Sequence, residues 1–336
     1  MTALRLSAQD IGDAGGVALA HALAACATVT SVDLAGNALG EASLVALGAA
    51  LGASSSALAN LSLSGNSVAP TDAGIAALAA GMRASRALRS LGLANCQLSD
   101  AQAVVLFDAL ADAAALTSLD VGSNATLLGD ADSIGNASAA LARLVAACPL
   151  AALTMPNMPA IDMSLVAHAL RSRAACELDA RNCALRESGG TAIAQLIAAN
   201  GAALRSADLS NNLMGDRATV ALAAALRPQP AHTAEAATSE ADAAVQTDNH
   251  PVDAALGSPA SSQPAAATRQ CALHTLRLSG NRIGDSGALA FAAVLRENAC
   301  PALKVLELTN RHVGKNLYGD EASIALADAL TVRFGY

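Results

Sequence analysis

Acidic residues recur at a regular position in the sequence, and carboxylates can supply general acid–base catalysis. A catalytic pair needs two carboxylates in one place. Here one acid follows the turn phrase of nearly every unit, as in "IGD", "LGE", "LSD" and "MGD", where a helix N-terminus exposes unpaired N–H groups. We therefore interpret these acids as helix caps. They are Asp13, Glu41, Asp100, Asp130, Glu187, Asp216 and Asp285.

Cys96 and Cys183 are the next candidates, because a thiolate is a strong nucleophile. Both lie three residues after an expected strand, at a position that asparagine otherwise occupies. An asparagine side chain can satisfy an amide and a carbonyl group of a turn, and a thiol replaces it weakly. We therefore predict that both cysteines are structural. The asparagines are Asn37, Asn66, Asn124, Asn212 and Asn281, and the position departs from the pattern at Gln9, Met158 and Arg311, which mark weaker or edge turns.

Established catalytic motifs are absent from the chain. It contains no pattern of a phosphate loop, a dinucleotide site, a zinc peptidase or a serine hydrolase, and its six histidines are scattered singly. We therefore expect no enzymatic activity, no cofactor and no metal.

The elements that position these residues follow from an internal repeat. The phrase "LRLSGNRIGDSGALAFAAVL" at 276–295 recurs as "ADLSNNLMGDRATVALAAAL" at 207–226 and as "VDLAGNALGEASLVALGAAL" at 32–51, and ten such units follow one another about every 29 residues. The first part of each unit alternates apolar and polar residues, which predicts a strand, and the second spaces apolar residues as a helix does. Parallel strands joined by helices on one side predict a curved solenoid.

Composition narrows the class of protein. Apolar residues make up 53% of the 336 residues but aromatic residues only 1%, so small side chains must form a thin core. A net charge of −8 without a basic cluster argues against a nucleic-acid partner. No signal sequence or apolar run of about 20 residues points to a membrane. Seven cysteines without a C-x-x-C pair favour the cytoplasm, with the cilium or nucleus as alternatives.

The repeated phrase resembles the ribonuclease-inhibitor-type leucine-rich repeat, with its Asn/Cys alternation, as in "LHTLRLSGNRIGDSGALAFAAVL" and "VTSVDLAGNALGEASLVALGAAL". The resemblance implies an α/β horseshoe of about ten strand–helix repeats with a parallel sheet on the concave face. It divides the chain into repeats one to eight at 1–226, an insertion at 227–270, and repeats nine and ten at 271–336. Ribonuclease inhibitors, activators of the Ran GTPase, recognition arms of immune receptors, tropomodulins and ciliary proteins share this repeat.

The insertion at 227–270 differs from the rest of the chain. It is rich in Pro, Ala, Ser and Thr, contains no aromatic residue and has neither a strand nor a helix period. Such a segment buries too little apolar surface to repay the entropy of ordering. We predict a disordered surface loop rather than a partner-binding motif.

The exposed strand residues, which line the concave surface, are the candidate partner-binding site. Asp120, Asp179 and Asp208 have two alternative roles. They could form the contact for a basic protein, or they could only keep the concave surface soluble. The concave candidates are Asp33, Asp120, Asp179, Asp208, Arg277 and Glu307, and the rim candidates are Arg217, Arg282 and Arg311.

Taken together, the residues favour a noncatalytic protein-interaction scaffold. The resemblance implies one alternative, an activator of a small GTPase of the Ran type, which the rim arginines could serve, although the acidic tail usual in that family is missing. A structural component of a cytoskeletal or ciliary assembly is the further alternative. The first strand begins near Leu4 with no element before it, which predicts association through the N-terminal face. The last helix, at about 322–332, with Phe334 and Tyr336, is expected to form a modest lid.

Overall fold

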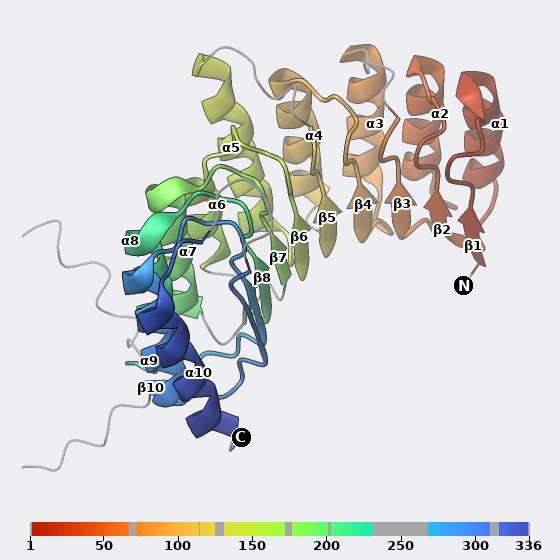
Figure 1. Cartoon of the computed structure of the whole chain (residues 1–336). Coiled ribbons are helices and arrows are strands. Elements are labelled where there is room, and N and C mark those ends of the chain that lie inside the picture. The colour runs from red at the N-terminus through yellow and green to blue at the C-terminus, as the bar shows by residue number, and fades with distance from the viewer. Residues whose placement is uncertain are drawn as a thin grey trace, which may run out of the picture.

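Ten strand–helix units form a curved stack in the computed structural model (Figure 1). The structure describes residues 2–66, 72–113, 115–124, 131–171, 177–200, 203–230, 268–309 and 316–334. The strands are β1 (Thr2–Arg5), β2 (Val29–Asp33), β3 (Asn60–Ser62), β4 (Ser90–Gly92), β5 (Ser118–Asp120), β6 (Ala152–Thr154), β7 (Glu177–Asp179), β8 (Ser206–Asp208), β9 (Gln229–Pro230), β10 (Thr268–Arg269), β11 (Thr275–Arg277) and β12 (Val305–Glu307). The helices are α1 (Gly12–Ala24), α2 (Glu41–Gly52), α3 (Asp72–Ala84), α4 (Asp100–Ala113), α5 (Ala131–Ala147), α6 (Met163–Leu170), α7 (Arg186–Asn200), α8 (Gly215–Ala225), α9 (Asp285–Arg296) and α10 (Asp320–Phe334).

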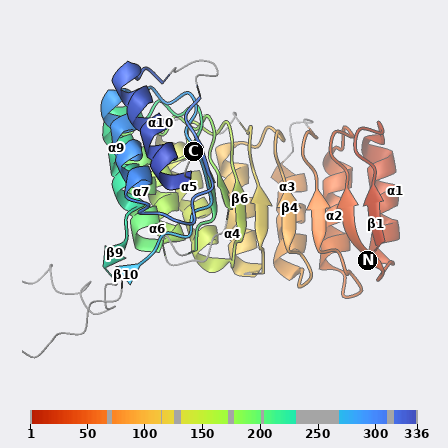
Figure 2. The same ribbon diagram turned by 60° about the horizontal axis from the view of Figure 1, so that its bottom comes forward.

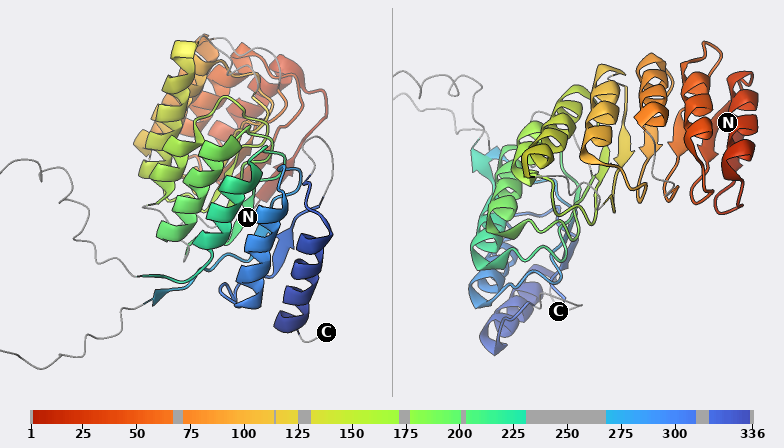
Figure 3. Two further views of the ribbon diagram at one scale, coloured as in Figure 1. Left: turned by 60° about the vertical axis from the view of Figure 1, so that its left-hand side comes forward. Right: turned by 90° about the horizontal axis from the view of Figure 1, so that it is seen from above.

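The main sheet is parallel throughout and follows the chain order. Its ten strands run β1 to β8, then β11 and β12, and each pairs with the strand of the next unit. The strands line the inner side of the arc, the helices form a single layer outside them, and the termini lie at opposite ends (Figures 1 and 3). The predicted solenoid with a concave parallel sheet is therefore confirmed.

Alternation along each strand creates the core. In most strands the central residue is buried and its two neighbours are partly exposed, as at Leu61, Leu91 and Leu119. These side chains meet leucines and alanines from the helices, and Phe107 and Phe291 are the only aromatic residues among the largest fully buried side chains of the described chain. The core is thus the thin layer that the composition predicts.

Small residues allow neighbouring helices to approach closely. A Cβ atom added to Gly81 of α3 would collide with the carbonyl oxygen of Gly48 of α2, and one added to Gly48 would collide with the backbone of Ala77. Backbone contact of this kind is open only to glycine. The alanine- and glycine-rich composition is therefore a packing requirement of the outer layer.

The asparagine ladder connects the units, as the sequence predicts. The Oδ1 atom of Asn66 accepts hydrogen bonds from the backbone N–H groups of Asn37 and Leu39, at 2.9 and 3.2 Å, and its Nδ2 donates to the carbonyl oxygens of Leu34 and Leu63. Each asparagine thereby satisfies buried backbone groups in its own unit and in the preceding one. Asn37, Asn124, Asn212 and Asn281 bond in the same way.

Both cysteines in the ladder are structural, which confirms that part of the prediction. The Cys96 thiol donates to the carbonyl oxygen of Leu63 at 3.3 Å, and the Cys183 thiol donates to that of Met155 at 3.0 Å. Burial raises the pKa of each thiol to about 11. Neither is a thiolate near neutral pH, so neither is a nucleophile.

The ladder ends differently from the prediction in the tenth unit. Arg311, the residue at the expected position, lies outside the described residues. Asn316 takes the ladder role instead, because its Oδ1 accepts the N–H groups of Asn281 at 2.8 Å and Ile283 at 3.1 Å. Asn316 lies five positions beyond Arg311 in the sequence, and through it the final unit keeps the ladder.

Four of the recurrent acids are caps, but they cap a different helix from the one predicted; the caps expected at Glu41 and Asp100 stay predictions. The Asp13 carboxylate, in the first turn of α1, accepts the N–H groups of Gly40 and Ser43 at the start of α2, at 2.9 and 2.8 Å. Asp216 does the same for α9, Asp285 for the chain before α10, and Glu187 for α8. Each of these four carboxylates accepts a hydrogen bond from a backbone N–H group at or just before the N-terminus of the next helix. Asp130 lies outside the described residues.

The predicted insertion begins and ends on a pair of short strands. β9 and β10 form an antiparallel pair apart from the main sheet, at the edge of the stack (Figure 2). Residues 231–267, which hold most of the predicted loop, lie outside the described residues.

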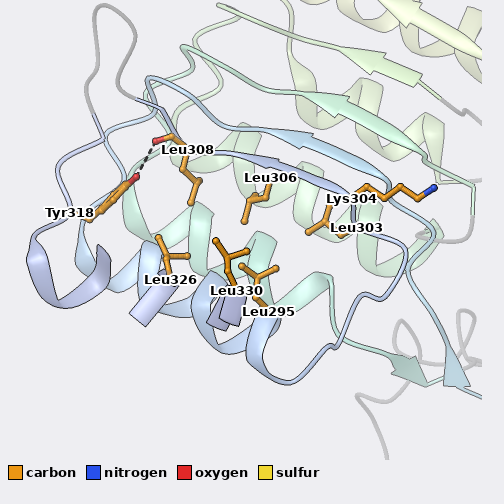
Figure 4. Close-up of a pocket in the computed structure, with 8 residues that line it drawn as sticks. All are labelled: Leu295, Leu303, Lys304, Leu306, Leu308, Tyr318, Leu326 and Leu330. Atoms are coloured by element: carbon orange, nitrogen blue, oxygen red, sulfur yellow. Dashed lines mark hydrogen bonds between the residues drawn. The ribbon is translucent and has the colours of Figure 1, made fainter. Parts of the chain in front are cut away.

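The two ends of the stack expose different surfaces. Helix α10 covers the last unit incompletely and leaves an apolar pocket of 270 Å³ between itself, α9 and the strand layer (Figure 4). The tenth unit also carries five of the nine exposed large apolar side chains among the described residues, and the first unit carries none. The five are Val305, Leu317, Ile324, Leu330 and Val332. Helix α10 is thus a partial lid; the Phe334 side chain and Tyr336 lie outside the described residues, and association through the N-terminal face stays a prediction.

Candidate functional site

The sheet places the six concave candidates in one row, at the last residue of each strand. Its register sets Asp179 beside Asp208, Asp208 beside Arg277, and Arg277 beside Glu307. Asp120 lies two strands before Asp179, with Thr154 between them. Asp33 is separated from Asp120 by Ser62 and Gly92 in the same row. The structure therefore brings four candidates together, places Asp120 near them and leaves Asp33 apart.

A residue that the sequence analysis missed connects the first two of these acids. Arg181 donates from Nη2 to Oδ2 of Asp179 at 2.7 Å and lies 3.7 Å from Oδ2 of Asp208 through its Nε. Arg277 continues the series, since its Nη1 lies 4.0 Å from the same Asp208 oxygen and its Nε lies 3.1 Å from Oε2 of Glu307. We call Asp179, Arg181, Asp208, Arg277 and Glu307 the charged ladder.

A signal for Arg181 was present in the sequence. It follows Asp179 by two residues, and side chains two apart on an extended chain face the same side. Strand β7 ends at Asp179, so a search restricted to strand residues stops short of it. Hydrogen bonding to Asp179 raises the pKa of Arg181, which keeps this guanidinium charged.

The concave aspartates also serve the local fold. One carboxylate oxygen of each accepts the N–H group two residues further on, which stabilises the turn that leaves the strand. The distances are 3.0 Å for Asp33 and Asp120, 3.2 Å for Asp179 and 3.1 Å for Asp208. The Asp179 and Asp208 carboxylates also meet Arg181, which donates from Nε to Oδ1 of Asp179 at 2.9 Å and lies 3.7 Å from Oδ2 of Asp208. These two residues therefore combine a structural role with an electrostatic one.

Asp120 differs electrostatically from the ladder acids. It has no ion pair among the described residues. Burial raises its pKa above the ordinary value, and the negative charge of Asp179 adds to that rise. Asp120 is therefore an uncompensated acid beside the charged ladder.

A row of amide side chains runs along the turns next to the charged ladder. Asn157 Nδ2 donates to the Ser123 hydroxyl at 2.9 Å, and Asn182 Nδ2 donates to Asn157 Oδ1 at 2.9 Å. Both asparagines have a positive φ, at 60° and 54°, a region that asparagine tolerates better than most residues. The amides therefore extend the polar inner surface towards the rim.

The three rim arginines are not gathered in one place. Arg282 is exposed in the turn between β11 and α9. Arg217 lines a hollow on the outer face together with residues of α6 and α7. Arg311 lies outside the described residues.

The described residues offer neither a metal-binding cluster nor a membrane-spanning helix. Within the described ranges, no group of three or more His, Cys, Asp or Glu side chains could hold a metal ion. The same part of the chain contains no helix with the length and apolar character needed to cross a membrane.

A repeat family matches two parts of the chain. The leucine-rich repeat family, described as "Leucine Rich repeat", matches residues 25–48 and 270–292, which belong to the second and ninth units. No curated protein matches the chain.

Two solved structures are similar to the chain over most of its length. A leucine-rich repeat-containing protein, LegL7, from Legionella pneumophila is 18% identical, with 100% of this chain and 91% of that chain covered and a TM-score of 0.49. A chain of the yeast Rad7 and Elc1 complex is also 18% identical, with 96% and 71% covered and a TM-score of 0.49.

The family match falls on two units separated by more than 200 residues, and the structure repeats their strand–turn–helix build ten times. These findings do not distinguish the ribonuclease-inhibitor type from other types of the repeat. The repeat units share the strand phrase, the asparagine ladder and the parallel sheet. These shared features identify the chain as a leucine-rich repeat protein.

Proposed function

We propose that the chain is a noncatalytic interaction scaffold that binds a protein partner on its concave face, with the charged ladder at the centre of the contact. The observation that carries this proposal is the series of five charged side chains on four adjacent strands and the turn after β7, with neighbouring members 2.7 to 4.0 Å apart. Partly exposed ion pairs of this kind contribute only about 0–1 kcal/mol to stability. Their charges can therefore be exchanged for contacts with a partner at little cost to the fold.

Charge on this surface favours basic contact groups on the partner. Three carboxylates in the charged ladder oppose two guanidinium groups, and Asp120 adds a fourth carboxylate nearby. Complementary charge accelerates association and discriminates between partners more than it increases affinity. We therefore propose a partner whose contact surface is basic overall but includes acidic groups that can face Arg181 and Arg277.

The experiment compares a concave variant with a matched variant of the outer face. Asp179→Asn/Asp208→Asn removes two ladder charges, while each asparagine can still accept the turn hydrogen bond. Asp108→Asn/Asp112→Asn removes two carboxylates and two exposed ion pairs, to Arg143 and Arg83, from the helices. Quantitative affinity purification with each protein should recover the same partner with the wild type and the outer variant, and lose it with the concave variant. Equal recovery with all three proteins would exclude the charged ladder as the contact.

The alternatives receive less support from the geometry. A GTPase activator of the Ran type positions the machinery of the docked GTPase and sometimes presents an arginine to it, and the rim arginines of the described chain lie apart. No observation singles out a cytoskeletal or ciliary assembly. Six cysteines of the described chain form no disulfide bond, which supports the proposed cytoplasmic location.

A further inference from the structure

The outer face contains a groove where the sixth helix is short. Helix α6 has 8 residues, whereas its neighbours α5 and α7 have 17 and 15. Two adjoining hollows result, one of 610 Å³ between α5 and α6 and one of 590 Å³ between α6, α7 and the start of α8. His168 and Arg171 line both hollows. We call the two together the outer groove.

One half of the outer groove is apolar. Small side chains of α5 form one wall, and Leu165 and Ala169 of α6 form the other. Leu165 is 41% exposed, which places a large apolar side chain in contact with water. The α5 residues of this wall are Ala139, Ala142 and Ala146, with Arg143 at its edge.

The other half of the outer groove is polar and cationic. Arg171 donates from Nη2 to Oε1 of Gln195, but its Nε is buried and has no partner among the described residues. Arg217 lines the far side and forms no ion pair within the described chain. The hydroxyl groups of Ser164, Ser188 and Thr191 line the same half.

The single acid in this half of the groove is already engaged. Oε2 of Glu187 accepts the N–H group of Ala218 at 2.8 Å, in the first turn of α8, where the helix dipole also offsets a negative charge. Arg217 lies in that same first turn, where the dipole disfavours a cation. Arg217 therefore does not stabilise α8. Together with Arg171 it makes the groove locally positive, although the chain as a whole has a net charge of −8.

We propose that the outer groove binds an amphipathic helix with an acidic face, supplied by a second protein partner. Leucine-type side chains of that helix would lie on Leu165 and the alanines of α5, and its carboxylates would face His168, Arg171 and Arg217. The length fits, because α6 is shorter than its neighbours by 7 to 9 residues, which is about two helical turns. This mode, an apolar helix face laid in a groove with charges at its flank, is a general one for peptide recognition.

The test uses a designed peptide and one variant for each half of the groove. The probe is a fluorescent helical peptide of about 14 residues with leucine at i, i+3, i+4 and i+7 and glutamate at the other positions. Arg217→Glu removes the cationic contact and places a favourable acid in a first helical turn, so the fold should be retained. Leu165→Asp changes an exposed apolar contact. Arg296→Glu, in the last turn of α9 and outside the groove, is the matched control.

Fluorescence anisotropy should show that each groove variant weakens binding of the acidic peptide about tenfold or more, a change of about 1.4 kcal/mol. The control should bind as the wild type does, and so should Asp179→Asn/Asp208→Asn, because the charged ladder lies on the opposite face. A peptide with lysine in place of glutamate should not bind.

Three results would overturn the proposal. They are no binding of the acidic peptide to the wild type, equal binding by both groove variants, and loss of binding with Arg217→Glu but not with Leu165→Asp. The last result, together with displacement by inorganic phosphate, would make the groove a small-anion site instead.

Discussion

The stretch from the first to the fourth unit and the stretch from the fifth to the tenth share one repeat but present different surfaces. In the earlier stretch the concave row passes through Ser62 and Gly92, and helices α2 and α3 touch through their backbones at Gly48 and Gly81. In the later stretch the same row carries the charged ladder, and the helix layer opens into the outer groove at α6. The comparison shows that buried positions impose the repeat, whereas exposed positions and irregular units are free to differ.

The largest expected effect tests whether the repeat is equally strong in both stretches. Asn66→Ala removes four hydrogen bonds of buried backbone groups, and Asn212→Ala removes five. We expect each substitution to lower the free energy of unfolding by about 2–4 kcal/mol, because backbone N–H and C=O groups would remain buried without hydrogen-bond partners. Urea unfolding followed by circular dichroism measures this.

Cys183→Ala is the control for the ladder, because a thiol is a weak donor and its loss should cost about 1 kcal/mol or less. If Asn212→Ala cost no more than Cys183→Ala, the ladder would not be the element that holds the units together.

Gly81→Ala tests the close helix packing of the earlier stretch. The added methyl group would collide with the Gly48 carbonyl oxygen, and the backbone cannot move without separating α2 from α3. We expect a loss of about 1–3 kcal/mol, although alanine is the better helix former. Gly52→Ala is the control, because its methyl group would make an ordinary contact with Ala84 at 3.5 Å. Equal melting temperatures for the two variants would show that the helices are not in backbone contact.

Asp13→Ala and Asp216→Ala test the caps between units in the two stretches. Each substitution leaves N–H groups of the next helix without an acceptor, and we expect a loss of about 1 kcal/mol at neutral pH. The Ser43 hydroxyl, together with the N–H groups of Ser43, Gly40 and Ala42, holds the pKa of Asp13 below its ordinary value. The stability that Asp13 contributes is thus present above the pKa of the unfolded state and is lost as pH falls through the folded value.

Thermal unfolding from pH 7 downwards should therefore show the Asp13→Ala variant converging on the wild type in acid. A constant difference between them at all pH values would mean that the carboxylate charge has no part in the cap.

Asp120→Asn should have the smallest effect and the opposite dependence on pH. Burial raises the pKa of Asp120, so the folded state disfavours its charge, and the wild type loses stability as pH rises through the folded pKa. Asparagine can still accept the Gly122 hydrogen bond and carries no charge. We expect the variant to be at least as stable as the wild type at neutral pH and to lose that advantage in acid. A variant less stable than the wild type at pH 7 in the same thermal scans would contradict this.

Several features could be predicted from the sequence because they depend on local periods. Strand and helix positions follow from alternation and from i, i+3, i+7 spacing, and the ladder follows from recurrent Asn and Cys at one offset. The sequence correctly predicted that acids such as Asp13 cap helices, but it assigned each acid to its own helix instead of the next one. Local sequence shows only the helix that contains Asp13, whereas the groups it caps, in Gly40 and Ser43, lie 27 and 30 residues away.

Candidate sites could be predicted only in part. Asp179, Asp208, Arg277 and Glu307 were placed in one row, since the strand period determines which side chains face the concave surface and which face the core. Arg181 was missed because it lies beyond the end of β7, and the outer groove could not be anticipated because it depends on a difference in length between three neighbouring helices.

The sequence by itself determined the repeat, the parallel order of the strands and the identity of the buried ladder, because each unit carries the same local instructions and can bury its apolar face only against its neighbours. Only the tertiary structure decided which charges meet on the concave face, which helix each acid caps, and where the outer layer opens. Those outcomes depend on distances between side chains of different units, and no spacing within a single unit encodes them.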